Sequence, residues 1–255
     1  MVVSMDYRSA NRAFSPIKRL SWVLVPIVAL GGIVYPWLGF TVVGIMILLM
    51  GFALLRGKYW CGNLCPHGSL FDVVLLRRSP LRAIPGFFRS PILKWAFFVY
   101  FMIVFAGRLS GAFDYLGEPV FADRLGYVFV RQYLVWPTLV GIALALVINP
   151  RTWCSFCPMG TMQEVMYKAG ALARLNGRSD VRVAWADSER CRHCSLCARV
   201  CPMQLEPHQE IDDEAFHHAC IRCSTCVEHC PEEALGIGQS QEPLGDQPRA
   251  KGGGS

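Results

Sequence analysis

The feature that most restricts how this chain can fold is its charge-free run from Leu20 to Leu55, 36 residues without Asp, Glu, Lys, Arg or His. A single helix of that length would rise about 54 Å, far more than the ~30 Å hydrocarbon core of a bilayer. Pro36 and Gly39 lie near the midpoint of the run and favour a break in the helix. The run therefore predicts a hairpin of two membrane spans, at residues 21–36 and 38–55.

Two later apolar segments, residues 91–108 and 131–149, are also predicted to cross the membrane. Of all residues, 53% are hydrophobic and only 17% are charged, which is unusual for a soluble protein of this length. Together these segments predict an all-α polytopic membrane domain of four transmembrane helices, at residues 21–175.

The distribution of positive charge predicts the orientation of the spans. Lys and Arg gather before the first span and between the second and third, whereas the last connection carries Asp114, Glu118 and Asp123. Because positive residues stay on the cytoplasmic side, we expect an N-terminal cytoplasmic tail (1–20), a cytoplasmic C-terminus and location in a bacterial cytoplasmic (inner) membrane. Attraction to anionic membrane lipid explains the net charge of +6, so no nucleic acid partner is predicted.

The chain changes character after residue 175, because residues 176–238 are polar and hold eight of the twelve cysteines. They contain "CRHCSLCARVCP" and "CIRCSTCVEHCP", each with the spacing C-x2-C-x2-C-x3-C-P. In this spacing three thiolates hold one [4Fe–4S] cluster and the fourth ligates the neighbouring cluster. Zinc sites and disulfides fit the spacing and the compartment less well. The region is therefore predicted to be a small α+β two-cluster ferredoxin domain, followed by a disordered tail at 239–255.

The same spacing predicts which cysteines share a cluster. The predicted ligands of one cluster are Cys191, Cys194, Cys197 and Cys230, and those of the other are Cys201, Cys220, Cys223 and Cys226. Clusters of this kind transfer single electrons, so the chain needs a redox partner. No histidine lies in a predicted span and no C-x-x-C-H occurs, so no haem is predicted. Since no nicotinamide or flavin motif is present either, the quinone and quinol pool is the remaining exchangeable partner.

The other four cysteines lie in two similar segments, "WCGNLCPHGSL" from Trp60 and "WCSFCPMGTM" from Trp153. Each follows a predicted hairpin of two spans, which predicts a two-fold internal repeat. The pairs Ser69/Asp72 and Thr161/Glu164 fit the capping-box signature of a helix start, and His67 is interpreted as a solvated loop residue. The turns would meet at the cytoplasmic side and offer four ligands for a third iron–sulfur cluster or another metal. Alternatively, these four cysteines pack as small apolar residues. They are Cys61, Cys65, Cys154 and Cys157.

Four spans, two Cys–Pro turns and a two-cluster ferredoxin domain resemble the NapH-type membrane ferredoxins, with related patterns in the NosR C-terminal region, MauN and CcoG-type proteins. The resemblance covers residues 15–235 and rests on all twelve cysteines. The second turn has the spacing C-x2-C-P, where the family usually carries C-x3-C-P twice. The resemblance implies a quinol dehydrogenase-type electron-transfer subunit that works with other redox subunits and exchanges electrons with the quinone pool.

A second interpretation comes from a different class of function. A CcoG-like protein could act as a metal-reducing or assembly factor for a respiratory metalloenzyme, using the thiolates at the membrane edge. A structural anchor for a larger redox complex is a third interpretation. The sequence assigns no catalytic residue, and a cluster at the four membrane-edge cysteines would favour electron transfer over the other two.

Overall fold

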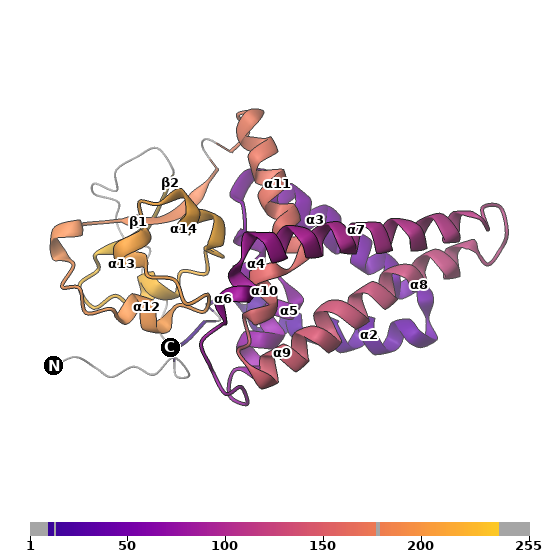
Figure 1. Cartoon of the computed structure of the whole chain (residues 1–255), viewed down its shortest axis with the longest axis horizontal. Coiled ribbons are helices and arrows are strands. Elements are labelled where there is room, and N and C mark those ends of the chain that lie inside the picture. Colours follow the sequence, from indigo (N-terminus) through magenta and orange to yellow (C-terminus); the bar gives the residue numbers. More distant parts are fainter. Residues whose placement is uncertain (1–9, 13, 177–178, 240–255) are drawn as a thin grey trace.

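The computed structural model describes residues 10–12, 14–176 and 179–239. These form a bundle of long helices with a smaller domain packed against one end (Figure 1). Half of the predicted N-terminal tail, and all but the first residue of the predicted C-terminal tail, lie outside the described residues.

Among the described residues, four helical segments are long and apolar enough to cross a membrane, as predicted: Pro16–Val34, Pro36–Arg56, Pro91–Phe113 and Phe121–Val147. The first contains α1 (Pro16–Leu20), η1 (Ser21–Val23) and α2 (Leu24–Val34), and the second contains η2 (Pro36–Leu38) and α3 (Gly39–Arg56). The third is α7 (Pro91–Phe113), and the fourth contains α8 (Phe121–Tyr133), η4 (Leu134–Val140) and α9 (Gly141–Val147). The first helix begins within the predicted tail because the Ser15 side chain accepts a hydrogen bond from the Lys18 amide and Pro16 occupies the first helical position.

The fourth span contains a π-helical turn, η4, around Pro137. Proline has no amide hydrogen, so it cannot donate to the carbonyl of Tyr133 four residues earlier. The hydroxyl of Thr138 donates to that carbonyl instead, at 2.8 Å. A local exchange of hydrogen bonds therefore keeps the span continuous through a proline.

Close backbone contacts hold α8 against the first hairpin. A Cβ atom added to Gly126 would lie 2.2 Å from the Pro36 carbonyl oxygen, and one added to Gly39 would lie 2.0 Å from the Gly126 carbonyl oxygen. Small residues at such crossings let helices in a membrane approach closely. These two glycines therefore determine how tightly the two hairpins pack.

Short helices follow the second and fourth spans and carry the cysteine turns. The first turn comprises α4 (Tyr59–Asn63), α5 (Pro66–Ser69) and η3 (Leu70–Leu75), and α6 (Gly86–Arg89) precedes the third span. The second turn comprises α10 (Thr152–Phe156) and α11 (Pro158–Leu172).

The predicted capping boxes are wrong. The helices after the turns begin at Pro66 and Pro158, so Cys65 and Cys157 occupy the N-cap positions. Proline favours the first helical position, which starts each helix four residues before the predicted place. The Ser69 hydroxyl instead donates to the Lys18 carbonyl, and the Thr161 hydroxyl donates to the Cys157 carbonyl.

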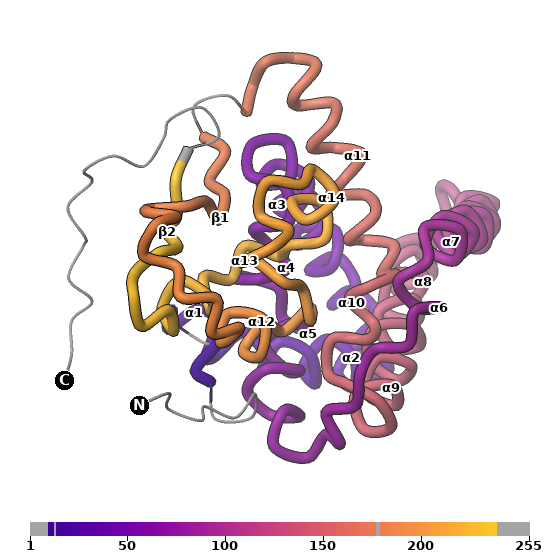
Figure 2. The backbone as a smooth tube through the Cα atoms, turned by 60° about the vertical axis from the view of Figure 1, so that its left-hand side comes forward, coloured from indigo at the N-terminus to yellow at the C-terminus, as the bar shows by residue number. Residues whose placement is uncertain are grey.

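The smaller domain contains a two-stranded antiparallel sheet, with β1 (Val181–Trp185) paired to β2 (Leu235–Gln239). Between the strands lie η5 (Ser188–Arg190), α12 (Leu196–Val200), α13 (Pro207–Glu210), α14 (Glu214–Ala219) and α15 (Thr225–Glu228). Val183, Ile211, Phe216 and Leu235 form its core with Cys197 and Cys226. Figure 2 shows this domain lying over the cysteine turns at the end of the helical bundle.

Backbone contacts and buried charges join the smaller domain to the helical bundle. A Cβ atom on Gly62 would lie 2.1 Å from the Ile221 carbonyl oxygen, so the first turn touches the domain directly. Arg222 donates to the Arg56 carbonyl at 2.7 Å and forms an ion pair with Asp180. These contacts place the ferredoxin-like loops beside the membrane-edge cysteines.

We expect Gly126→Ala to destabilise the bundle, because its new methyl group meets the Pro36 carbonyl oxygen. Overpacking of this kind costs about 1–3 kcal/mol. The matched control is Gly44→Ala on α3, since nothing lies within 4 Å of a Cβ there. Thermal unfolding in detergent should give a lower midpoint for Gly126→Ala than for Gly44→Ala. Equal midpoints would contradict the close crossing.

Candidate metal centres

All twelve cysteines lie in the described part of the chain, and none forms a disulfide. They fall into three groups of four, and each group lines one cavity. We call these groups the outer, inner and membrane-edge cysteines, in the order in which they approach the helical bundle.

The outer cysteines line a small cavity beside Leu196 and Leu235. Cys230 comes from the second run and joins the three leading cysteines of the first run, which is the exchange that the spacing predicts. His193 and Ser195 have positive φ angles of 50° and 56°, so the loop curls around the cavity. The outer cysteines are Cys191, Cys194, Cys197 and Cys230.

The inner cysteines line a second small cavity, with Met203, Phe216 and Ile221 as apolar cover. The second run repeats the left-handed residues at Arg222 and Ser224. Backbone amides of Leu205 and Arg222 each donate to a cysteine sulfur at 3.4 Å. Such amides stabilise a thiolate or a cluster of net negative charge. The inner cysteines are Cys201, Cys220, Cys223 and Cys226.

The membrane-edge cysteines come from both turns and line one end of a larger cavity. Burial and the three neighbouring thiols raise the pKa of Cys61 well above its ordinary value, and burial raises the pKa of Cys157 to about 12. Four thiolates could therefore coexist here only with a bound cationic centre. The membrane-edge cysteines are Cys61, Cys65, Cys154 and Cys157.

The donor set fits iron–sulfur clusters. Within residues 10–12, 14–176 and 179–239, no three His, Cys, Asp or Glu side chains come close enough together to hold a single metal ion. The thiols are instead spread around cavities. Four thiolates around a cavity suit a cluster, because it brings its own iron and sulfide between the ligands.

The inner and membrane-edge cysteines are neighbours. Cys61 and Cys154 pack against an apolar cluster that contains Cys201 and Cys223. Ile221 lines the cavities of both groups. A single layer of side chains therefore separates a site at the membrane edge from the ferredoxin-like domain.

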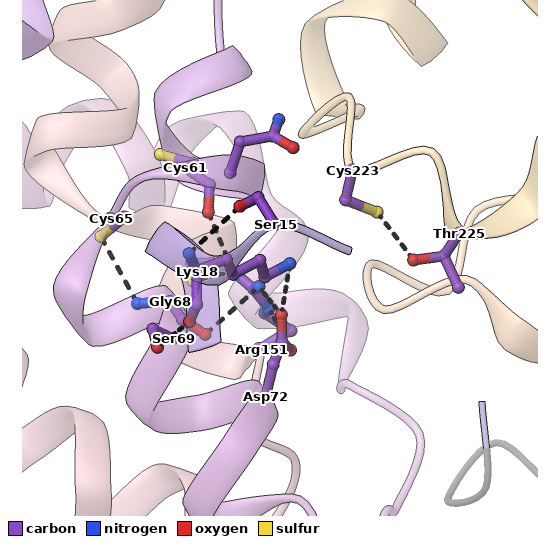
Figure 3. A network of polar contacts seen from close by, with 12 residues as sticks. Ser15, Lys18, Cys61, Cys65, Gly68, Ser69, Asp72, Arg151, Cys223 and Thr225 are labelled. Atoms are coloured by element: carbon purple, nitrogen blue, oxygen red, sulfur yellow. Dashed lines mark hydrogen bonds and ion pairs between the residues drawn. The ribbon is translucent and has the colours of Figure 1, made fainter. Parts of the chain in front are cut away.

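A buried ion network supports the membrane-edge cysteines, as Figure 3 shows. The Arg151 side chain is fully buried; its Nε lies 3.1 Å from Asp72 Oδ1, and its Nη1 lies 3.5 Å from Cys154 Sγ. Lys18 Nζ lies 2.9 Å from Asp72 Oδ2. Burial acts to raise the pKa of Asp72, but Arg151, Lys18 and Arg12 outweigh it and hold that pKa well below its usual range.

Arg151 was not predicted from the sequence, and neither was Gln163, whose Nε2 donates to Cys61 Sγ at 3.0 Å. Arg151 lies three residues before Cys154, and Gln163 lies six residues after Cys157 on α11. A polar residue near each cysteine turn was the available signal. The sequence does not indicate which residue of the other turn each one contacts. Arg151, for example, binds Asp72, which lies 79 residues away.

His67 is buried, so its interpretation as a solvated loop residue is wrong. Its Nε2 lies 2.9 Å from Thr138 Oγ1, and its ring centre lies 4.5 Å from that of Tyr133. Because the Thr138 hydroxyl donates to a backbone carbonyl, its oxygen accepts from the His67 Nε2–H group. Burial lowers the pKa of His67 to about 3, which leaves the ring neutral at physiological pH.

We expect Asp72→Asn to destabilise the protein strongly, because Arg151 and Lys18 would lose their buried counterion. Removing one partner of a buried ion pair costs about 3–5 kcal/mol. Asp123→Asn, at an exposed carboxylate on α8, is the control and should unfold like the original chain. Chemical unfolding in detergent measures both, and a neutral Asp72→Asn variant would refute a structural role for the network.

Comparisons with known proteins agree with this architecture. A 4Fe-4S binding domain model matches residues 38–84 and 133–177, and a 4Fe-4S dicluster domain model matches residues 184–236. The former ranges contain the membrane-edge cysteines, and the latter contains the outer and inner groups. No solved structure matches the chain.

Curated relatives are about a quarter identical to the chain over the aligned residues. The ferredoxin-type protein NapH of Haemophilus influenzae is 26% identical over 76% of this chain and 67% of its own length. NapH of Escherichia coli is 25% identical, over 76% of this chain and 66% of its own length. The methylamine utilization ferredoxin-type protein MauN of Methylorubrum extorquens is 27% identical, over 67% of this chain and 55% of its own length. These similarities support the resemblance drawn from the cysteine motifs: the chain carries 4Fe–4S binding domains and is similar to the NapH-type membrane ferredoxins.

Proposed function

We propose that this protein transfers electrons between the quinone pool of the membrane and a redox partner, through three [4Fe–4S] clusters. The observation that carries the proposal is the series of three cysteine-lined cavities. It begins among the membrane helices, passes Ile221 and ends in the ferredoxin-like domain. Similarity to NapH and MauN, which are ferredoxin-type proteins, supports it.

Each group of four cysteines is proposed to hold one cluster. The outer and inner groups pair the ligands as the two C-x2-C-x2-C-x3-C-P runs predict. The membrane-edge group is proposed as a third cluster, although its second turn is one residue shorter. In both turns the second cysteine is the N-cap residue of a helix that begins with proline, so the two turns present equivalent positions despite the different spacing.

A bound [4Fe–4S] cluster would accept and release one electron at a time. Oxidation of one quinol to its quinone gives up two electrons and two protons. The electrons leave singly toward a one-electron-accepting redox protein, and the protons pass to water at the membrane surface. The chain itself contributes the order of the sites and the polar groups that face their sulfur atoms.

The polar groups around the membrane-edge cysteines have separate tasks. Arg151 and Gln163 direct N–H groups at Cys154 and Cys61, and Gly68 N–H donates to Cys65 Sγ at 3.4 Å. Hydrogen bonds to sulfur and exclusion of water raise or lower a cluster's reduction potential. Asp72 offsets part of the positive charge of Arg151 and Lys18, so the network keeps a net positive charge beside the cysteines.

The clusters are proposed to lie on the cytoplasmic side of the bacterial inner membrane. The cysteine turns and the ferredoxin-like domain lie at the end of the bundle where the first and third spans begin (Figure 1). Lys18, Arg56 and Lys94 lie at span ends on this side. Such a bias indicates the cytoplasm. The outer cysteines lie beneath exposed Arg192 and His193, where a redox subunit could dock.

The two halves of the membrane domain are proposed to be an internal repeat. One family model matches two ranges, 38–84 and 133–177. Each range contains a span end, a cysteine turn and the start of the following helix. Duplication of such a unit explains how four cysteines from distant segments come to surround one cavity.

Iron content tests the third cluster and separates electron transfer from the alternative role in metal reduction or assembly. We expect about twelve irons and twelve sulfides per chain, and about eight of each in the Cys61→Ser, Cys65→Ser double variant. EPR spectra of the dithionite-reduced protein should lose one signal. Ser155→Ala on α10 is the control and should keep all three. Eight irons in both proteins would refute the third cluster, and copper binding or thiol–disulfide exchange would then support the alternative.

Gln163→Leu should lower the midpoint potential of the membrane-edge cluster, because the amide no longer stabilises added negative charge on Cys61. Loss of one hydrogen bond to sulfur corresponds to a shift on the order of 50 mV for a one-electron centre. An EPR-monitored redox titration measures this shift. The two ferredoxin signals in the same sample serve as the internal control, and a shift shared by all three would contradict a local effect.

A further inference from the structure

We propose that the cavity above the membrane-edge cysteines holds the headgroup of a lipid-soluble quinone, with Gln132 and Tyr133 donating hydrogen bonds to its carbonyl oxygens. This inference rests on the proposed function, because it names the site where exchange with the quinone pool takes place. It concerns binding and positioning by two residues of the fourth span.

The cavity lies among membrane spans. Its lining includes Met46 from α3, Phe105 from α7 and Phe129 from α8, and α8 packs against both α3 and α7. A ligand in this place must therefore come from the hydrocarbon layer. The cavity has a volume of about 130 Å³. This volume includes the end lined by the membrane-edge cysteines, so a ring would lie in the remaining part, beside Gln132 and Tyr133.

Three buried donors on residues that line this cavity lack partners among the described residues: the amide nitrogen of Gln132, the hydroxyl of Tyr133 and the indole nitrogen of Trp60. Gln132 and Tyr133 are adjacent residues of α8. The two residues are only 5% and 7% exposed, and both line the cavity. A buried donor without an acceptor costs about 1–3 kcal/mol. The cavity is therefore incomplete without a ligand that brings hydrogen-bond acceptors.

Arg108 determines which end of the Gln132 amide is free. Its Nη1 donates to Gln132 Oε1 at 2.6 Å. A guanidinium group can only donate, so the oxygen must face Arg108 and the NH₂ group remains available. Arg108 thus presents Gln132 as a donor, which selects for a ligand with a carbonyl oxygen.

The residues at the cysteine end of the cavity, together with the Gln132 and Tyr133 donors, indicate which class of ligand would bind. Cys65 and Cys157 line the same cavity as Gln132 and Tyr133, and the Tyr133 ring lies 4.5 Å from that of His67, two residues after Cys65. A flat apolar ring with two carbonyl oxygens would meet the aromatic lining and both donors. A lipid acyl chain would leave both donors unpaired. A quinone therefore fits, and it would sit beside the proposed third cluster.

The test measures quinone binding separately from electron transfer. The full chain with its clusters, in detergent, is titrated with a short-chain benzoquinone that carries a decyl tail. Quenching of tryptophan fluorescence reports binding, because Trp60 and Trp153 line the cavity. We expect Tyr133→Phe and Gln132→Leu each to weaken binding about tenfold, the loss of roughly one hydrogen bond. Tyr127→Phe, at an exposed tyrosine on the same helix, should bind like the original chain.

Reduction of the clusters by the corresponding quinol, followed by absorbance, distinguishes the two proposals. Quinol reduction with unchanged binding in both variants would overturn this site and leave the proposed function standing. Displacement of the quinone by decane at equal concentration would also overturn it, since decane has no acceptor. If the original chain neither binds the quinone nor is reduced by the quinol, the proposed function itself fails. Tyr133→Phe keeps the ring, and unchanged iron content would show that it folds.

Discussion

The site at the membrane edge depends on one buried carboxylate, Asp72, and the two cations that it binds. Lys18 lies in the first span, Asp72 follows the first cysteine turn, and Arg151 precedes the second turn. Charges away from water are tolerated only when they are paired, so none of these segments can move without exposing an uncompensated charge. The network therefore holds both cysteine turns in one geometry and places an N–H donor beside Cys154.

A second buried acid, Glu164, forms ion pairs beside the second cysteine turn, as Asp72 does beside the first. Glu164 on α11 binds Lys58 at 2.6 Å and Lys94 at 2.7 Å, and so joins the end of the second span to the start of the third. Burial acts to raise the pKa of Glu164, but Lys58 and Lys94 outweigh it and lower that pKa. Each helix after a cysteine turn thus carries one acid that binds cations from two other segments. Asp72 and Glu164 therefore hold the two cysteine turns together, because each carboxylate binds two cations from segments that are distant in the sequence.

These constraints explain how the membrane domain and the ferredoxin-like domain work as one unit. Arg222 reaches from the inner cysteine loop to the Arg56 carbonyl, and Asn63 donates to the Arg222 carbonyl at 3.1 Å. The first turn therefore contacts the loop that carries the inner cysteines. These contacts suit electron transfer, because they hold the inner cysteines beside the membrane-edge cysteines without any movement of the smaller domain. The cavity at the opposite end of the series is lined by residues of the membrane helices and of both cysteine turns.

Much of the architecture was predictable because it depends on local order along the chain. The charge-free run of residues 20–55 predicts a membrane hairpin from length and hydropathy alone, and cysteine spacing predicts that Cys230 joins the first run. The capping boxes were wrong because Pro66 and Pro158 start the helices earlier. The roles of Arg151, Gln163 and His67, and the cavity with its unpaired donors, were decided by tertiary structure. They arise between segments tens of residues apart, and no local pattern records which buried polar group will meet which partner.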